Sequence, residues 1–250
     1  MDRAVWDMMC DGVTEVMRAY TRPFATPLFF GQSLEGSGNF VNIGGQDYLA
    51  TCDHVAKQRR LDYRFFGLDR TFSAHDEWQA KPFPIDLAFA PLLYDQFHEA
   101  DHFAKTIPYD RFAKKHEPVQ YELLFFRGYA GENSQTIGGF SEALATGYCS
   151  QETGSSNTDG YVEIFWEPNK TRFTRGTSEE AKARIRYDDP QGFSGSLVWN
   201  TRFVEVLSNG SAWRPEDAVI TGMAHRWDEK KKSLLVYRVE HIRQFISEKL

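Results

Sequence analysis

The apolar positions of this chain fall mostly in short runs of about four to ten residues, bounded by turn-forming residues. From Pro27 onward the runs have the length and the aromatic and β-branched content of strands. Gly44-Gly45 is a good two-residue hairpin turn, and Tyr129-Ala130-Gly131 and Asn209-Gly210 are further turn signals. The predicted strands are Leu28–Ser33, Asn39–Ile43, Gln46–Thr51, Leu61–Gly67, Ile85–Pro91, Gln120–Gly128, Phe140–Cys149, Tyr161–Trp166, Leu197–Trp199, Phe203–Leu207, Val219–His225 and Leu234–Tyr237.

Helical spacing of apolar residues occurs at both ends of the chain, over residues 3–20 and over Val239–Leu250. Residues 92–117 interrupt the strand pattern, and we interpret them as an inserted helical segment; Ser178–Arg184 is either a helix or a solvated loop. The pattern predicts an N-terminal helix over 1–26, a first β half over 27–117 and a second β half with the C-terminal helix over 118–250. Together they form one domain.

Composition narrows the class of protein. The chain has 250 residues, 41% of them hydrophobic, enough for a large core. A net charge of −6 gives no reason to expect nucleic-acid binding, and no apolar run is long enough to span a membrane. Three cysteines cannot form a disulfide framework, and the acidic N-terminus is unlike a secretory signal, so we expect a cytoplasmic protein.

Three segments carry candidate chemistry. Thr51-Cys52-Asp53-His54 places a histidine directly after an apolar strand, and Asp86 is a single carboxylate within the apolar run 84–90. Gly192-Phe193-Ser194-Gly195 has glycines on both sides of a serine, and glycine permits a tight turn that exposes a hydroxyl. Such a turn also aims successive N–H groups at one point, which acyl transfer needs for its oxyanion.

In this order the three segments resemble the trypsin/chymotrypsin-like serine peptidases, whose motifs are T-x-x-H, D-x-A and G-x-S-G. The resemblance implies two antiparallel six-stranded β-barrels. It also implies that Ser194 is the nucleophile, that His54 is the general base and that Asp86 orients the imidazole. The N–H groups of Gly192 and Ser194 would form the oxyanion hole. The expected activity is that of a serine endopeptidase with no cofactor and no metal, acting on a protein or peptide substrate and open to control by a regulatory protein partner.

The chain departs from the secreted members of that family. Phe193 stands where zymogen-activated enzymes carry an aspartate, so packing or a partner must order the oxyanion turn. Such departures resemble a diverged intracellular bacterial branch. Counting back from Ser194, Asp188 is the candidate base of the substrate pocket and would favour Arg or Lys at P1. A shift by one residue would give that role to Asp189 or turn both acids to solvent. The strand around His225 and Arg226 is expected to supply the pocket wall.

Two other functions remain open. His98-Glu99-Ala100-Asp101-His102 matches the H-E-x-x-H motif of zinc metallopeptidases, although the charged Asp101 and the polar flanks favour a solvated helix. The second alternative is a catalytically silent, peptidase-like binding module.

Overall fold

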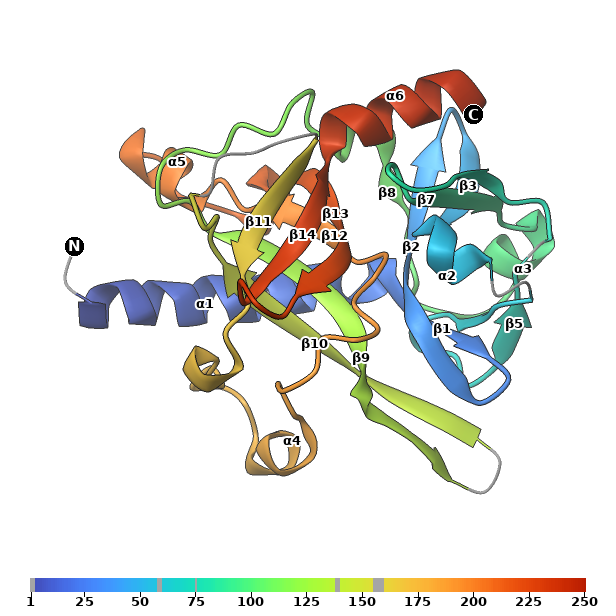
Figure 1. Cartoon of the computed structure of the whole chain (residues 1–250), viewed down its shortest axis with the longest axis horizontal. Coiled ribbons are helices and arrows are strands. Elements are labelled where there is room, and N and C mark those ends of the chain that lie inside the picture. The colour runs from blue at the N-terminus through green and yellow to red at the C-terminus, as the bar shows by residue number, and fades with distance from the viewer. Residues whose placement is uncertain (1–2, 58–59, 75, 138–139, 155–159) are drawn as a thin grey trace.

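Two antiparallel sheets lie side by side and make up most of the chain (Figure 1). The computed structural model describes residues 3–57, 60–74, 76–137, 140–154 and 160–250. The first sheet has the strand order β5-β4-β1-β2-β3-β7-β6, with β8 parallel to β2. Its strands are β1 (Ala25–Phe30), β2 (Ser33–Ile43), β3 (Gln46–Thr51), β4 (Asp62–Arg64), β5 (Thr71–Ser73), β6 (Gln79–Lys81), β7 (Leu87–Pro91) and β8 (Ile107–Pro108).

The second sheet has the order β10-β9-β12-β13-β14-β11. Its strands are β9 (Leu124–Ile137), β10 (Phe140–Ser150), β11 (Tyr161–Phe165), β12 (Leu197–Asn200), β13 (Val219–Asp228) and β14 (Ser233–Arg238). The predicted antiparallel two-sheet architecture is therefore confirmed. The first sheet differs from the predicted six strands, because β5, β6 and β8 are too short to leave a periodic pattern; β4 lies within the predicted strand Leu61–Gly67. Tyr129-Ala130-Gly131 continues β9 rather than turning, and the register shift falls just after Tyr129, where residues 130–133 of β9 lie opposite a single residue of β10 between Ala143 and Ala145.

Helices cover the sheets and join them (Figure 1). They are α1 (Arg3–Thr21), α2 (Asp53–Ala56), α3 (Tyr94–His98), α4 (Glu179–Arg184), α5 (Phe203–Ser208) and α6 (Val239–Lys249), with short 3₁₀ turns at Arg22–Phe24, Tyr109–Arg111, Pro168–Lys170 and Pro215–Asp217. Both terminal helices form where the spacing predicts them. The division into residues 1–26, 27–117 and 118–250 stays a prediction, and residues 1 and 2 lie outside the described residues.

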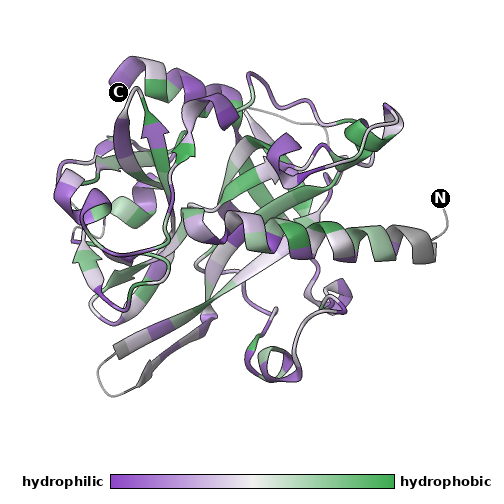
Figure 2. Cartoon of the chain, turned by 180° about the vertical axis from the view of Figure 1, so that it is seen from behind, coloured by the Kyte–Doolittle hydropathy of each residue, from purple (hydrophilic) through white to green (hydrophobic). Residues whose placement is uncertain are grey.

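The terminal helices are anchored in one core that spans both sheets. Seen from behind, α1 crosses the second sheet and alternates apolar and polar residues (Figure 2). Its Met17 is fully buried, and Tyr20 contacts Trp199 edge-to-face with ring centroids 5.9 Å apart. On α6, Phe245 stacks on Phe89 of the first sheet at 5.4 Å. The two halves are thus fixed to each other by shared apolar packing, and this packing positions the site between them.

Phe203–Leu207, predicted as a strand, is the helix α5. A short apolar run of this kind suits either a strand or a helix, and a contact with a distant carboxylate decides between them. Glu122 is buried, and its side chain accepts from the amides of Val204 and Glu205 and from the Thr201 hydroxyl, each at 3.1 Å. A carboxylate that satisfies the free N–H groups of a first turn stabilises a helix there. No local pattern around residue 203 could reveal this contact.

The helix predicted within 92–117 is short. α3 ends at His98, and the chain then runs extended to β8. Two contacts fix this extended run, because Phe103 donates its amide to the Phe66 carbonyl at 2.7 Å and Lys105 donates to the Pro23 carbonyl at 2.9 Å. These long-range bonds replace the helical ones.

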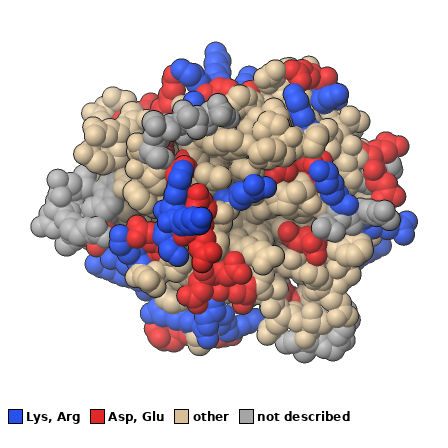
Figure 3. Space-filling view, in the orientation of Figure 1, with Lys and Arg blue, Asp and Glu red and all other residues tan. Residues whose placement is uncertain are grey.

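Lys, Arg, Asp and Glu are interspersed over the face shown in Figure 3, with uncharged areas between them. Among the described residues, no helix is long and apolar enough to cross a membrane.

Candidate active site

His54 and Asp86 are brought together by the pairing of β3 with β7, in which Thr51 lies opposite Ala88. His54 lies in the first turn of α2, which begins two residues after β3 ends. Asp86 directly precedes β7 and has φ of 55°, a left-handed conformation that is uncommon outside glycine. The sequence pattern placed Asp86 inside a strand, whereas the structure begins β7 at Leu87. The resulting bend turns its carboxylate toward α2.

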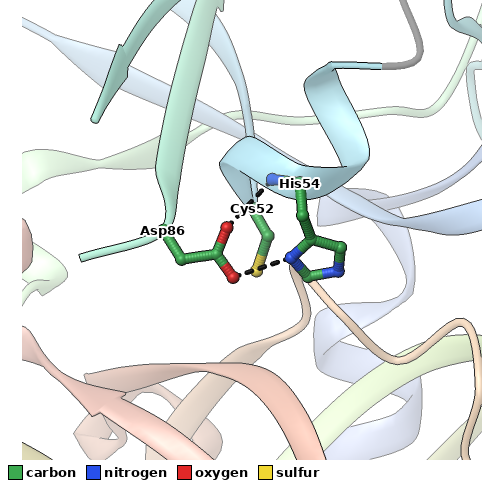
Figure 4. Close-up of side chains that lie close together, drawn as sticks. All are labelled: Cys52, His54 and Asp86. Atoms are coloured by element: carbon green, nitrogen blue, oxygen red, sulfur yellow. Dashed lines mark hydrogen bonds and ion pairs between the residues drawn. The ribbon is translucent and has the colours of Figure 1, made fainter. Parts of the chain in front are cut away.

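The Asp86 carboxylate holds His54 by two hydrogen bonds (Figure 4). The His54 amide donates to Oδ1 at 2.9 Å, and the ring Nδ1 lies 2.7 Å from Oδ2. An ionised carboxylate only accepts, so Nδ1 carries the proton and Nε2 of the neutral ring is left as a base. The His54 side chain is 47% exposed, while that of Asp86 is 5% exposed. The acid is therefore held in the protein and the imidazole reaches solvent.

A second imidazole also contacts this carboxylate. His225 on β13 is buried, its Nδ1 lies 3.3 Å from Asp86 Oδ2, and its ring stacks on Tyr161 with centroids 5.0 Å apart. Burial alone would raise the pKa of Asp86. The hydrogen bonds from His225 and from the ring and amide of His54 outweigh that effect and hold the pKa of Asp86 well below its ordinary value. Asp86 is therefore ionised throughout the physiological range.

The Ser194 turn is bonded to both sheets. The Gly195 amide donates to the Ala224 carbonyl of β13 at 2.8 Å, and the Ser37 amide of β2 donates to the Ser194 carbonyl at 2.8 Å. Gly195 has φ of +92°, and a Cβ there would lie 2.1 Å from the Ser37 carbonyl oxygen. Gly192, at φ of +107°, is similarly close to Tyr129, whose carbonyl oxygen a Cβ would meet at 2.6 Å. Glycine at position 195 thus allows the turn to approach β2 of the first sheet, and glycine at position 192 allows it to approach β9 of the second.

Phe193 anchors the turn from within the second sheet. Its side chain is 1% exposed and lies among the rings of Phe126, Tyr148 and Trp166, with centroids 5.3 to 5.7 Å away. The apolar residue between Gly192 and Ser194 therefore packs into a core instead of accepting a charged amine. Aromatic packing of Phe193 therefore holds the turn together with its backbone hydrogen bonds.

The turn leaves two amides available. Among the described residues, the N–H groups of Gly192 and Ser194 donate to no backbone carbonyl. The Ser194 hydroxyl donates to the His225 carbonyl at 3.1 Å rather than to His54. Both Ser194 and His54 nevertheless line one cavity of about 450 Å³. The base, the hydroxyl and the free amides thus border the same space.

The predicted substrate-pocket residues fall into different places. Asp188 is exposed and does not line the cavity beside Ser194, whereas Asp189 does. Arg226 is in the cavity wall, with its guanidinium 5.6 Å from the Phe83 ring centroid. His225 also borders the cavity, but its ring is turned to Asp86. Sequence reasoning missed that contact, and no local signal shows it, since 139 residues separate the two.

Ser37 is a further residue that the sequence analysis did not single out. Its buried hydroxyl donates to the Gly192 carbonyl at 2.8 Å and accepts from the Tyr129 amide at 2.9 Å. One side chain of the first sheet therefore fixes both the turn and β9. A serine in a glycine-rich strand carries no pattern that would identify this role.

The H-E-x-x-H motif does not form the arrangement that a zinc metallopeptidase requires. His98 is the last residue of α3, and His102 lies beyond the helix, so the two histidines do not share a helical face. His98 Nε2 lies 2.9 Å from an Asp47 oxygen, and His102 Nε2 lies 2.8 Å from the Phe97 carbonyl oxygen. Each histidine ring therefore contacts a different oxygen atom of the protein.

A different group of metal-capable side chains surrounds the His54–Asp86 pair. The donor atoms of Cys52, His54 and Asp86 lie within 4.8 Å of one another. Burial, reinforced by the Asp86 charge, raises the pKa of the Cys52 thiol well above its usual range, so the thiolate that binds a metal is disfavoured. A metal would also have to displace the 2.7 Å His54–Asp86 hydrogen bond. The geometry suits a hydrogen-bonded acid–base pair better than a metal centre.

Comparison with known proteins identifies the fold. No protein-family model and no curated protein matches the chain. Mouse neuropsin, a serine protease, is 14% identical with a TM-score of 0.52, over 92% of this chain and 95% of that one. A mutant of human heparin binding protein (CAP37) is 13% identical with a TM-score of 0.52, over 90% of each chain. The serine protease domain of the Sesbania mosaic virus polyprotein is 13% identical over 89% of this chain and 91% of its own, at a TM-score of 0.49. The chain has the two-sheet fold of trypsin-like serine proteases.

Proposed function

We propose that this chain is a serine endopeptidase that hydrolyses peptide bonds through His54, Asp86 and Ser194. The observation that carries the proposal is the cavity bordered by three groups: an imidazole whose Nδ1 is held by an ionised carboxylate, a serine hydroxyl, and two available amides. Acyl transfer requires a base, a nucleophile and oxyanion donors around one carbonyl.

In this mechanism the Ser194 hydroxyl leaves the His225 carbonyl and turns to His54 Nε2, which takes its proton as Oγ attacks the substrate carbonyl. Catalytic hydrogen bonds often form only when substrate binds, so the resting geometry is compatible with this step. The Gly192 and Ser194 amides stabilise the oxyanion, each worth about 3 kcal/mol in enzymes of this type. Asp86 stays ionised and stabilises the imidazolium. His54 then returns the proton to the leaving amine.

The proposal also covers the cellular location of the protein and its substrate specificity. Cys10, Cys52 and Cys149 are free thiols, which supports a cytoplasmic member of a diverged, intracellular bacterial-type branch, under the control of a partner or signal. The cavity beside Ser194 is the proposed P1 subsite. A preference for Arg or Lys there would depend on Asp189, the carboxylate that lines the cavity, and would be opposed by Arg226.

A fluorophosphonate probe, which reacts with activated serines, tests the proposal. We expect stoichiometric labelling of the wild-type protein and none of Ser194→Ala, together with a loss of peptidase activity of about 10⁴- to 10⁶-fold. Ser196→Ala is the matched control. Its hydroxyl is buried two residues after Ser194 and has no hydrogen-bond partner among the described residues, so this variant should label normally.

Two results would replace the proposal. Peptide cleavage that survives Ser194→Ala and stops with a zinc chelator would favour the metallopeptidase. A folded wild-type protein that neither labels nor cleaves would be a binding module.

A further inference from the structure

A second and larger cavity, of about 970 Å³, lies apart from the active site and shares no lining residue with it. Its walls come from the C-terminal half of α1, the start of β1, residues 64–69 after β4, the inner part of the β9–β10 hairpin and the segment around α4. Cavities of this size commonly hold small-molecule ligands. The proposed catalysis makes no use of it.

Unpaired arginines distinguish this cavity. Arg18, Arg22, Arg64 and Arg127 line it, and within the described part of the chain none of them forms an ion pair. Arg22 lies over the Phe66 ring at 4.2 Å, which leaves its N–H donors free. The contacts of the others are also few: Arg64 Nε donates to a threonine hydroxyl at 3.3 Å, and Arg127 donates to the Arg18 carbonyl at 3.0 Å.

Arg127 has an unsatisfied donor inside the protein. Its Nε is buried with no hydrogen-bond partner among the described residues. Burial, with a smaller contribution from the nearby charges of Arg18 and Arg22, lowers the pKa of Arg127 to about 10, so it still carries its charge at neutral pH. A buried cation that faces two further cations is unfavourable until an anion joins them.

The carboxylates that line the cavity do not supply this anion. Glu142 is paired with Arg184 at 3.0 Å, and Glu15 accepts from the Gly176 amide at 2.7 Å. The lining holds five arginines and four acidic residues, a balance of +1 in a chain whose net charge is −6. The four acidic residues are Glu15, Asp69, Glu142 and Glu180.

We propose that this cavity binds a small molecule bearing a di- or triphosphate group, held by Arg18, Arg22 and Arg127. Three guanidinium groups together call for more than the single negative charge of a carboxylate, and their planar donor forks match phosphate oxygens. The cavity volume exceeds what the phosphates alone require, so it also has room for the rest of such a molecule.

The site is connected to the oxyanion turn by one strand, and this link depends on the proposed peptidase function. On β9, Arg127 and Tyr129 line the phosphate cavity. The Tyr129 amide donates to the Ser37 hydroxyl at 2.9 Å, and that hydroxyl donates to the Gly192 carbonyl at 2.8 Å. A ligand that draws Arg127 toward it therefore acts two residues from the contacts that shape the turn. It regulates the reactivity of Ser194.

Calorimetric titration of Ser194→Ala protein with inorganic tripolyphosphate and with ATP tests binding independently of catalysis. We expect both to bind, and binding to weaken as salt is added. Arg22→Gln should weaken it at least about tenfold, the value of one charge-assisted hydrogen bond. Arg70→Gln should leave the affinity unchanged. Like Arg22, Arg70 is exposed and lies over an aromatic ring, 5.0 Å from the Phe72 centroid, but it is outside the cavity.

ATP that binds more tightly than tripolyphosphate would show that the cavity also holds the nucleoside, and equal affinity would show that it recognises phosphate alone. No binding of either probe, or equal binding by Arg22→Gln and wild-type protein, overturns the site. In wild-type protein, tripolyphosphate should change the rate of fluorophosphonate labelling, and Arg22→Gln should abolish that change. Binding without a change in rate overturns the link to the turn and leaves the peptidase proposal standing.

Discussion

Replacing Phe193 by alanine separates packing from charge as the cause of an ordered oxyanion turn. The ring is 1% exposed and contacts three aromatic neighbours, so its removal leaves a cavity inside the second sheet. Phe→Ala substitutions in cores cost about 3 to 5 kcal/mol. That is a large part of the roughly 5 to 15 kcal/mol by which a domain is stable, so we expect a much lower midpoint of urea unfolding.

The same change should affect reactivity. The Phe193 amide donates to the Pro190 carbonyl at 3.0 Å, and its carbonyl accepts from the Ser196 amide at 2.9 Å. Without the ring, these bonds alone hold the turn. Misplacing one oxyanion donor costs about 10²- to 10³-fold in rate, and we expect a loss of fluorophosphonate labelling rate of that order.

Urea unfolding followed by tryptophan fluorescence, combined with labelling kinetics in native buffer, measures both effects. Phe165→Ala serves as the control because that side chain, on the adjacent β11, is 44% exposed; its cost should stay below about 1 kcal/mol. Phe193→Leu should recover most of the stability. If Phe193→Ala unfolds at the wild-type urea concentration and labels at the wild-type rate, packing of this ring does not order the turn.

Two further changes address the buried carboxylate. Asp86→Asn should lower the labelling rate about 10⁴-fold with the fold retained. Because the folded state lowers the pKa of Asp86, its contribution to stability is present above the unfolded pKa of about 3.9 and is lost as pH falls below that value. Urea titrations between pH 7 and pH 3 should therefore show a steeper loss for wild type than for Asp86→Asn, and parallel curves would contradict the assignment. His225→Ala should lower the free energy of unfolding by about 1 to 3 kcal/mol, because Asp86 loses a hydrogen-bond donor. The acid limb of the pH–rate profile should also move to higher pH. An unchanged pH–rate profile would limit His225 to a role in packing.

The sequence was informative where local chemistry decides. Both terminal helices follow from apolar spacing, and β3 has the bounds that its pattern predicts. The motifs around His54 and Ser194 direct attention to segments that the fold brings to one cavity. In each case the signal lies within a few residues of the feature it describes.

Where long-range contacts decide, sequence patterns fail. The Glu122 carboxylate stabilises the short apolar run 203–207 as the helix α5, although 82 residues separate it from Val204. His225 does border the cavity beside Ser194, but its ring contact with Asp86 was missed because that contact depends on how the two sheets face each other. Counting back from Ser194 selected Asp188, but side-chain orientation within a loop is set by packing and put Asp189 at the cavity.

The bonds that tie the Ser194 turn to β2 have a consequence for synthesis. Ser37 and Gly192 are 155 residues apart in the chain, and Asn39 and Gly195, joined by a 2.7 Å hydrogen bond, are 156 apart. At translation rates of about 5 to 20 residues per second, the partners of Ser37 and Asn39 emerge about 10 to 30 seconds after them. During the later part of that interval, His54 and Asp86 have been synthesised and Ser194 has not. Under the proposed function, a growing chain therefore gains its nucleophile only when Ser194 has been synthesised, and the bond of the Ser194 turn to β13 forms later still.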